Sequence, residues 1–136
     1  MNPADGSIDE ARVATLLAVL GGQRLRELVA VLNLRLAAMA AELASGPGRW
    51  PGLKAIAHQT RGSASSLGLI ALAARLGDFE AAIDRSMDEA GVAPETLAEA
   101  AAEVAATLRR SLAALAAGFP DLAAHYDGPA PGASKR

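Results

Sequence analysis

A histidine, an arginine and a glycine stand close together near the middle of the sequence, as His58, Arg61 and Gly62. In a helix each residue turns the chain by roughly 100°, so this spacing places all three on one face. A glycine inside a helix costs roughly 1 kcal/mol relative to alanine, so Gly62 indicates that another molecule comes very close to the imidazole. The chemistry that this arrangement favours is nucleophilic attack by the imidazole on a phosphoryl donor.

The helix that must carry this histidine is predicted over residues 53–67, and its apolar side faces away from His58. The residues opposite or beside the histidine are Leu53, Ile56, Leu67, Ala57, Thr60 and Ala64. We therefore expect the imidazole to point outward. Lys54 and Ser65 lie within about 40° of His58 around the helix, so they are further candidates for contact with phosphate or with a partner.

Charge is distributed unevenly along the chain. Between Gly46 and Gly77 there is no acidic residue, whereas there are four cations, namely Arg49, Lys54, Arg61 and Arg75. We expect these cations to form a basic patch around His58 that attracts its partner at low salt. The net charge of the whole chain is −2, which argues against a nucleic-acid-binding protein, whose surface is normally basic.

The composition favours close-packed helices. Hydrophobic residues make up 51% of the 136 residues, but aromatic residues make up only 3%, whereas a sheet would be richer in aromatic and β-branched residues. Cysteine is absent, which excludes disulfides and cysteine-based zinc sites, and we expect no metal site. No segment has the length of a membrane span or the pattern of a secretory signal, so we expect a cytoplasmic protein.

Apolar stripes at helical spacing predict four longer helices, over about 23–45, 53–67, 69–87 and 94–118. Ser7 and Glu10 form a predicted capping box that opens a short helix ending at Gly21-Gly22. Prolines and glycines predict a turn over 46–52, a helix end at Gly91 and a helix start at Pro94.

We expect an all-α fold, with the four longer helices forming an antiparallel up-down-up-down bundle and the short N-terminal helix packed on it. The predicted domain covers residues 1–120. The Pro- and Gly-containing segment 121–136 is predicted to be a flexible tail.

The residues around the histidine resemble the signature of the histidine-containing phosphotransfer (HPt) family. That signature has a His, a Lys or Arg three residues later, then Gly and a small residue, and a Gly ten residues after the His. The matching residues are His58, Arg61, Gly62, Ser63, Gly68, Leu72 and Glu80, a motif of about 23 residues. Thr60 replaces the usual aliphatic residue, which affects core packing only, and Arg61 replaces the commoner Lys with the charge kept.

The resemblance implies that His58 accepts a phosphoryl group from a receiver-domain aspartate or a kinase and passes it to another receiver. The implied partners are response-regulator receiver domains and a sensor or hybrid histidine kinase, with the chain acting as a monomer. The receiver would supply Mg²⁺, and the chain would need no cofactor of its own. Arg61, Gly62, Lys54 and Ser65 would contact the phosphate or the receiver.

Glu80 follows His58 by 22 residues. At this spacing the phosphotransfer domain of the chemotaxis kinase, by resemblance, carries a Glu that holds the imidazole Nδ1. Because the helices on either side of Gly68 are expected to run antiparallel, Glu80 should return to about the height of His58. An Nδ1 contact would leave Nε2 free to attack.

Two other functional interpretations stay open. In the first, the chain is a phosphoacceptor domain excised from a larger hybrid or chemotaxis-type kinase. In the second, it is a phosphate-independent helical adaptor that holds a receiver on the same face. It contains no ATP-binding glycine boxes, so we expect no autonomous kinase activity. Leu69 is either an exposed apolar docking residue or the start of the core of the next helix, of which we favour the core, and we assign no role to His125. The serines after His58 provide no hydrolase arrangement.

Overall fold

The computed structural model describes residues 7–88, 94–120 and 122. Every regular element in these residues is helical, so the predicted all-α class is confirmed. The helices are α1 (Glu10–Leu20), α2 (Gly22–Ala44), a 3₁₀ turn η2 (Pro47–Arg49), α3 (Trp50–Ser66), α4 (Ile70–Asp88) and α5 (Pro94–Gly118). The predicted helix end at Gly91 and the predicted tail, apart from Leu122, lie outside the described residues.

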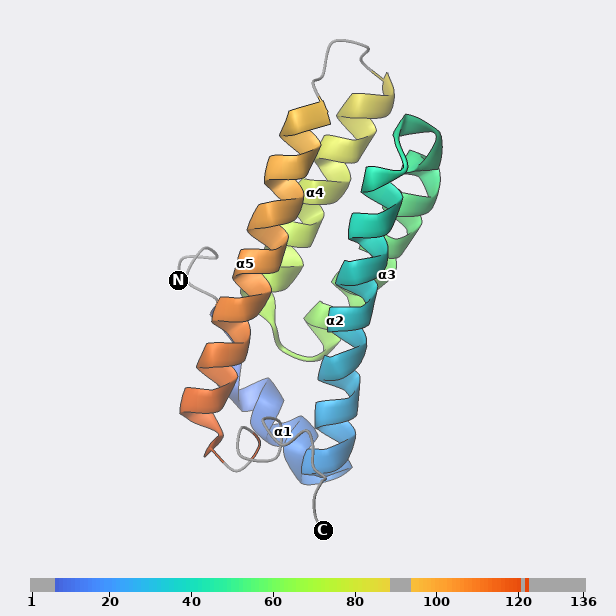
Figure 1. The fold of residues 1–136 in the computed structure, drawn as a ribbon. Helices are drawn as coiled ribbons and strands as arrows, with labels where there is room; N and C mark the ends of the chain where they lie inside the picture. Colours follow the sequence, from blue (N-terminus) through green and yellow to red (C-terminus); the bar gives the residue numbers. More distant parts are fainter. Residues whose placement is uncertain (1–6, 89–93, 121, 123–136) are drawn as a thin grey trace.

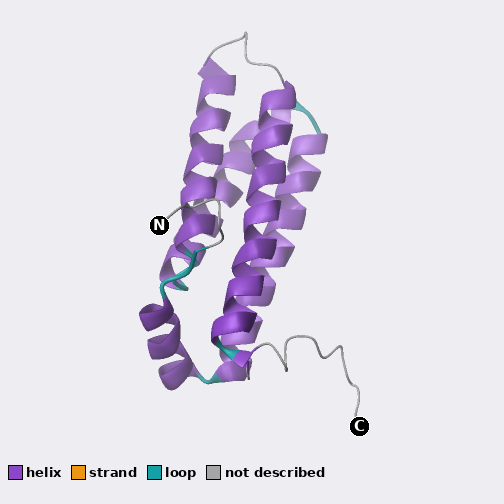
Figure 2. Cartoon of the chain, turned by 90° about the vertical axis from the view of Figure 1, so that its left-hand side faces the viewer, coloured by secondary structure: helices purple, strands orange, loops and turns teal. Residues whose placement is uncertain are grey.

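The four long helices lie side by side (Figure 1). Helix α3 packs between α2 and α4, α4 packs on α5, and a smaller contact joins α2 to α5. Helix α1 packs on α2 and lies at one end of the bundle, at an angle to the long helices (Figure 2). This arrangement places the middle of α3 beside both α2 and α4.

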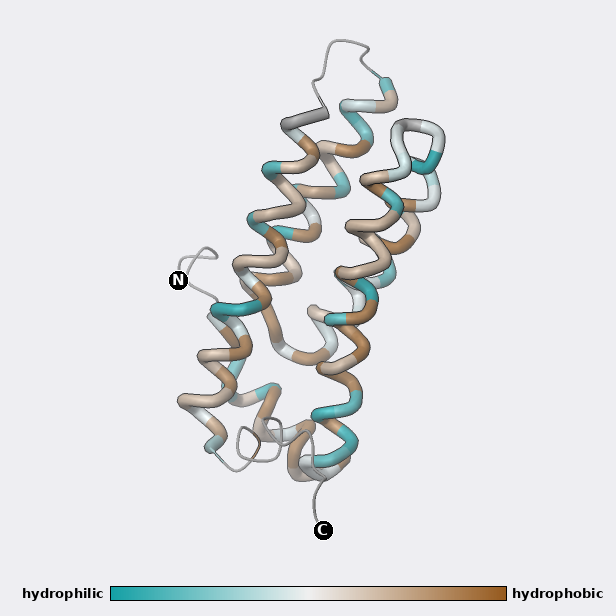
Figure 3. The backbone as a smooth tube through the Cα atoms, viewed as in Figure 1, coloured by the Kyte–Doolittle hydropathy of each residue, from teal (hydrophilic) through white to brown (hydrophobic). Residues whose placement is uncertain are grey.

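The core consists mainly of aliphatic residues. Apolar and hydrophilic residues alternate along each long helix (Figure 3), as the predicted stripes require. The largest fully buried side chains are Phe79, Leu25, Leu32, Leu53, Leu69, Leu72, Leu76, Ile83 and Leu97. No described helix is both long enough and apolar enough to cross a membrane.

Helix α3 begins three residues earlier than the sequence predicts. The predicted turn over 46–52 is wrong in its second half, because only Pro47–Arg49 forms a 3₁₀ turn and α3 starts at Trp50. Pro51 stands in the first turn of α3, where its missing N–H has no helical partner to lose. Trp50 is 8% exposed, so burial of its indole accounts for the earlier start.

The N-cap of α1 is Asp9, and the predicted capping box with Ser7 as N-cap is wrong. The Asp9 side chain accepts a hydrogen bond from the Arg12 backbone N–H at 3.1 Å. The Ser7 carbonyl accepts instead from the Ala71 backbone N–H at 3.1 Å. The chain before Asp9 is therefore held against the start of α4, and the helix opens only after it.

The joint between α3 and α4 is built on Gly68, which has a φ of +81°. The Asp9 N–H donates to the Gly68 carbonyl at 2.7 Å, and the Arg12 Nε donates to the Ser66 carbonyl at 3.0 Å. Leu69 is 1% exposed, which confirms its predicted place in the core. The hydrogen bonds of Asp9 and Arg12 thus hold the start of α1 against the C-terminal end of α3, the helix that carries His58.

Replacing Gly68 with alanine should lower the free energy of unfolding by roughly 1–2 kcal/mol, because a positive φ is unfavourable for any residue with a Cβ. The added Cβ would also lie 3.2 Å from the Arg12 side chain and the Asp9 carbonyl. Urea denaturation measures the change. Gly62→Ala is the matched control, since its Cβ meets nothing within 4 Å, and it should raise stability by up to about 1 kcal/mol. Equal stability of the two variants would contradict this account of the joint.

Candidate functional site

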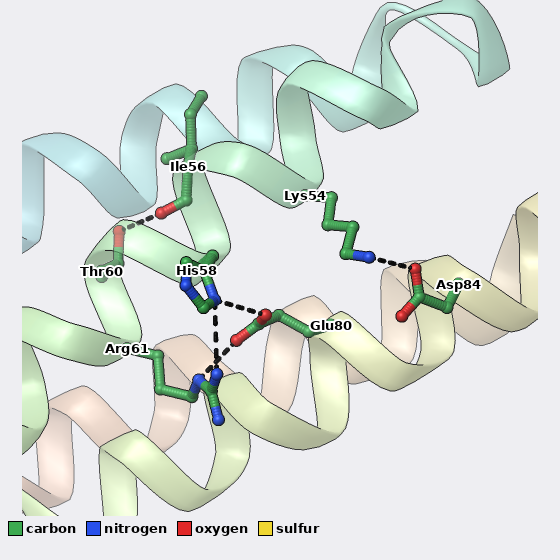
Figure 4. Close-up of polar contacts among 7 residues, drawn as sticks. All are labelled: Lys54, Ile56, His58, Thr60, Arg61, Glu80 and Asp84. Carbon is green, nitrogen blue, oxygen red and sulfur yellow. Dashed lines mark hydrogen bonds and ion pairs between the residues drawn. The ribbon is translucent and has the colours of Figure 1, made fainter.

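His58 lies in the middle of α3, and its side chain is 66% exposed, as predicted. Behind it, Leu53, Ala57, Thr60 and Ala64 are all fully buried. The Thr60 hydroxyl donates to the Ile56 carbonyl at 2.7 Å (Figure 4), so a polar residue is accommodated in the core without an unpaired group. The apolar back of α3 therefore fixes the helix rotation that presents the imidazole to solvent.

Glu80 of α4 holds one nitrogen of the imidazole. The His58 Nδ1 lies 3.0 Å from the Glu80 Oε1 (Figure 4). The Glu80 side chain is 11% exposed, so the carboxylate is well packed and its position is defined. An ionised carboxylate only accepts hydrogen bonds, so the tautomer that suits this contact carries its proton on Nδ1. The lone pair then lies on Nε2, on the side of the ring away from Glu80.

Arg61 completes a three-residue cluster with His58 and Glu80. Its Nε is 2.6 Å from the Glu80 Oε2, and its Nη2 is 3.3 Å from the His58 Nδ1 (Figure 4). A guanidinium only donates, so with the proton on Nδ1 the contact with His58 is a close approach and not a hydrogen bond. The Glu80 Oε2 has no hydrogen-bond partner of good geometry, so the closer contact is an ion pair and not an aligned hydrogen bond. Arg61 thus lies on the α4 side of His58 and balances the charge of the carboxylate.

Gly62 lies on an exposed ridge between two hollows. One of about 590 Å³, the α2–α3 hollow, is lined by Leu28, Val31, Arg35, His58, Gln59, Gly62, Ser63, Ser66 and Leu67. The other, of about 430 Å³, the α3–α4 hollow, is lined by His58, Arg61, Gly62, Ser65, Ala73 and Ala74. A Cβ added to Gly62 would meet nothing within 4 Å. Packing inside the chain therefore gives no reason for a glycine at this position.

The two remaining candidates, Lys54 and Ser65, both lie on the α4 side of α3. Lys54 forms an ion pair with Asp84 of α4, its Nζ being 2.6 Å from the Asp84 Oδ1 (Figure 4). The hydrogen bond to Asp84 and the charge of that carboxylate raise the pKa of Lys54 above its usual value. Ser65 is exposed and lines the α3–α4 hollow with Arg61. Ser65 therefore shares a surface with His58, whereas the Lys54 ammonium is engaged by α4.

The described residues contain no group of three or more His, Cys, Asp or Glu side chains that could hold a metal ion.

Comparison with known families decides which family contains this arrangement. The sequence model of the Hpt domain matches residues 23–118, which is more than half of the 136 residues. The matched region runs from α2 to α5 and includes His58, Arg61, Gly62 and Glu80. The chain belongs to the Hpt domain family. No curated protein and no solved structure matched the chain.

Membership associates the chain with phosphotransfer in two-component signalling, in which Hpt domains interact with receiver domains and kinases. In this Hpt domain, α1 precedes the matched region. Helix α1 is therefore an addition to the matched bundle, and it packs at the joint that ends α3.

The predicted basic patch of this Hpt domain is wrong, because each of its four cations is paired with a carboxylate. The pairs are Arg49–Glu42, Lys54–Asp84, Arg61–Glu80 and Arg75–Asp78. The segment between Gly46 and Gly77 does lack acidic residues, but α2 and α4 supply carboxylates across space to Arg49, Lys54 and Arg61. Asp78 lies just after the segment and pairs with Arg75 within α4. A run of like charge in sequence therefore gives little excess charge at the surface of this bundle.

Sequence reasoning missed one cation of the Hpt domain that lines a hollow beside His58. Arg35 of α2 lines the α2–α3 hollow, and its Nη1 donates to the Ser63 Oγ at 2.7 Å and to the Gln59 carbonyl at 3.4 Å. Arg35 precedes His58 by 23 residues and lies on a different helix. No sequence motif contains both residues. The available signal was a cation three residues after Leu32, at the edge of the apolar stripe of α2.

Proposed function

We propose that this Hpt domain is a phosphotransfer intermediate in which His58 carries the phosphoryl group. The group arrives from the aspartate of a response-regulator receiver domain, or from a sensor or hybrid histidine kinase, and leaves to another receiver aspartate. The observation that carries the proposal is the exposed imidazole whose Nδ1 is held by Glu80 at 3.0 Å, within a chain that matches the Hpt family. That contact leaves Nε2 as the nucleophile.

The transfer step requires little from this chain beyond a positioned nucleophile. The Nε2 lone pair forms the N–P bond while the P–O bond to the aspartate breaks and returns its electrons to the receiver carboxylate. The ring becomes a phosphorylated imidazolium, whose Nδ1–H charge Glu80 stabilises across 3.0 Å. The onward step reverses these bonds with a second receiver. We propose that the receiver brings the Mg²⁺ that neutralises the phosphoryl oxygens.

The ridge at Gly62 is the proposed path of approach for the receiver. The partner must bring a carboxyl-bound phosphoryl group in line with Nε2, so its surface comes against α3 on both sides of His58. Gly62 and the two hollows beside it provide that space. We further propose that the four long helices form the up-down-up-down bundle and that the domain acts as a cytoplasmic monomer.

Gly62→Gln should slow transfer from a phosphorylated receiver by at least about tenfold, because a side chain on the ridge displaces the receiver and small displacements strongly reduce transfer rates. Rapid-quench measurement of label moving between the two proteins gives the rate. Gly62→Ala is the matched control and should stay within about twofold of wild type, since a methyl group adds little bulk. A Gly62→Gln protein that transfers at the wild-type rate would show that the receiver does not approach over this ridge.

Incubation with a phosphorylated receiver and Mg²⁺ tests the proposed function. We expect the domain to gain label that is acid-labile and base-stable while the receiver loses it. The domain incubated with ATP and Mg²⁺ alone should stay unlabelled. A domain that binds the receiver but never gains label would instead be a phosphate-independent adaptor, which contradicts the proposal. A phosphoacceptor domain of a larger kinase would gain label in the same experiment.

A further inference from the structure

Two arginines flank His58, one on each side of α3. Arg61 lies on the α4 side, where Glu80 holds it in an ion pair at 2.6 Å. Arg35 lies on the α2 side and lines the same hollow as His58 and Gly62. The two arginines therefore line the hollows on opposite sides of His58 and come from different helices, and only one of them belongs to the sequence motif.

Their electrostatic situations differ. Within residues 7–88, 94–120 and 122, no carboxylate lies within ion-pair distance of Arg35, which bonds only to the neutral Ser63 hydroxyl and the Gln59 carbonyl. Arg61 and Lys54 each have a carboxylate partner. Arg35 is half-buried, so its charge is partly shielded from water. It is therefore an uncompensated positive charge beside the proposed phosphoacceptor.

The geometry leaves this charge available to an anion in the hollow. Both hydrogen bonds of Arg35 to the described residues use Nη1, and a guanidinium has further N–H donors on Nη2 and Nε. Gln59 and Ser63 are one helical turn apart, and Gly62 beside them has no side chain to separate Arg35 from His58. The Ser63 hydroxyl thus holds Nη1 of the Arg35 guanidinium. The Nη2 and Nε donors of the same guanidinium make no hydrogen bond to the described residues.

We infer that Arg35 is a second phosphate-binding residue of the site, one that donates to the phosphoryl oxygens once Nε2 of His58 carries the group. The inference rests on the proposed function. A phosphoryl group attached to a side chain adds about −1.5 to −2 charges at neutral pH, and arginine binds such oxygens through its planar fork. The positive charge of Arg61 is already balanced by the Glu80 carboxylate. Arg35 therefore supplies the positive charge that balances the phosphoryl group.

The first test needs no partner protein. The domain is charged with phosphoramidate, a small-molecule donor, and the Arg35 Nε–H signal is followed by ¹⁵N NMR. We expect this signal to shift on charging, while the signal of Arg24, an exposed arginine of α2 paired with Glu27, does not. An Arg35 signal that stays unchanged while His58 is charged overturns the inference.

The second test measures the equilibrium of the phosphoryl group between the domain and a receiver. Arg35→Gln should shift this equilibrium toward the receiver by about three- to tenfold, because the phosphorylated domain loses a charged hydrogen bond. Arg35→Lys should restore part of the shift, and the control Arg24→Gln should cause none. Binding of the unphosphorylated receiver should be the same for wild type and Arg35→Gln.

The outcomes separate this inference from the function on which it rests. A wild-type domain that takes no phosphoryl group from either donor overturns the proposed function and this inference together. A wild type that is charged normally, with Arg35→Gln at the same equilibrium, overturns the role of Arg35 alone. A variant that weakens binding of the unphosphorylated receiver without shifting the equilibrium makes Arg35 a docking residue, which also overturns the inference. Urea denaturation and circular dichroism of Arg35→Gln establish that the variant is folded before it is assayed.

Discussion

His58→Gln should abolish phosphoryl acceptance and leave the bundle intact. The variant removes the only nucleophilic nitrogen of the site, so we expect no label above background after incubation with a phosphorylated receiver. The side chain is 66% exposed, and a glutamine amide can still donate a hydrogen bond toward Glu80. The free energy of unfolding should therefore change by no more than about 0.5 kcal/mol, the range typical of surface substitutions.

The sequence provides a matched control for this variant, because it contains two histidines. His125→Gln should accept label at the wild-type level. Urea denaturation and circular dichroism establish that both variants are folded before they are assayed. Stoichiometric labelling of a folded His58→Gln protein would remove the basis of the proposed function.

Glu80→Gln should slow phosphorylation of His58 by at least about tenfold, because the neutral amide no longer stabilises the imidazolium that forms in the transfer step. The amide can also accept or donate at Nδ1, so the Nδ1-protonated tautomer loses its preference. Rapid-quench kinetics measures the first effect. The ¹⁵N chemical shifts of the two ring nitrogens of the unphosphorylated domain measure the second.

Asp84→Asn is the matched control for Glu80→Gln, because Asp84 lies one turn further along α4 and also pairs with a cation of α3. It removes a comparable charge without touching the imidazole, so it should leave both the rate and the tautomer unchanged. If Glu80→Gln behaved like Asp84→Asn in both measurements, Glu80 would be a structural partner of Arg61 and not a positioning residue for His58.

Much of the fold was predictable because it depends on periodic patterns within single helices. Apolar stripes predicted the helices, and the same helical periodicity predicted that His58 lies on the exposed face of its helix. The height of Glu80 followed from the return of the chain after Gly68, since antiparallel neighbours bring residues equally far from their joint to one level. These inferences need only the sequence on either side of one turn.

The features that sequence reasoning missed depend on choices between competing partners in space. Ser7 and Asp9 are both good N-cap residues, and the contact of the preceding chain with α4 decides between them. The partners of Lys54 and Arg61 come from another helix, so a charge count along the chain overstated the basic patch. Arg35 reaches the site from α2, and no local pattern connects it to His58.

The most direct test of the account locates the phosphoryl group on the charged domain. Peptide mapping by mass spectrometry under alkaline conditions identifies the residue, and ¹H–³¹P NMR correlation identifies the ring nitrogen. The account predicts one phosphoryl group per chain, on Nε2 of His58, because Glu80 occupies Nδ1 at 3.0 Å. A phosphoryl group on Nδ1, on His125 or on a serine of α3 would contradict it.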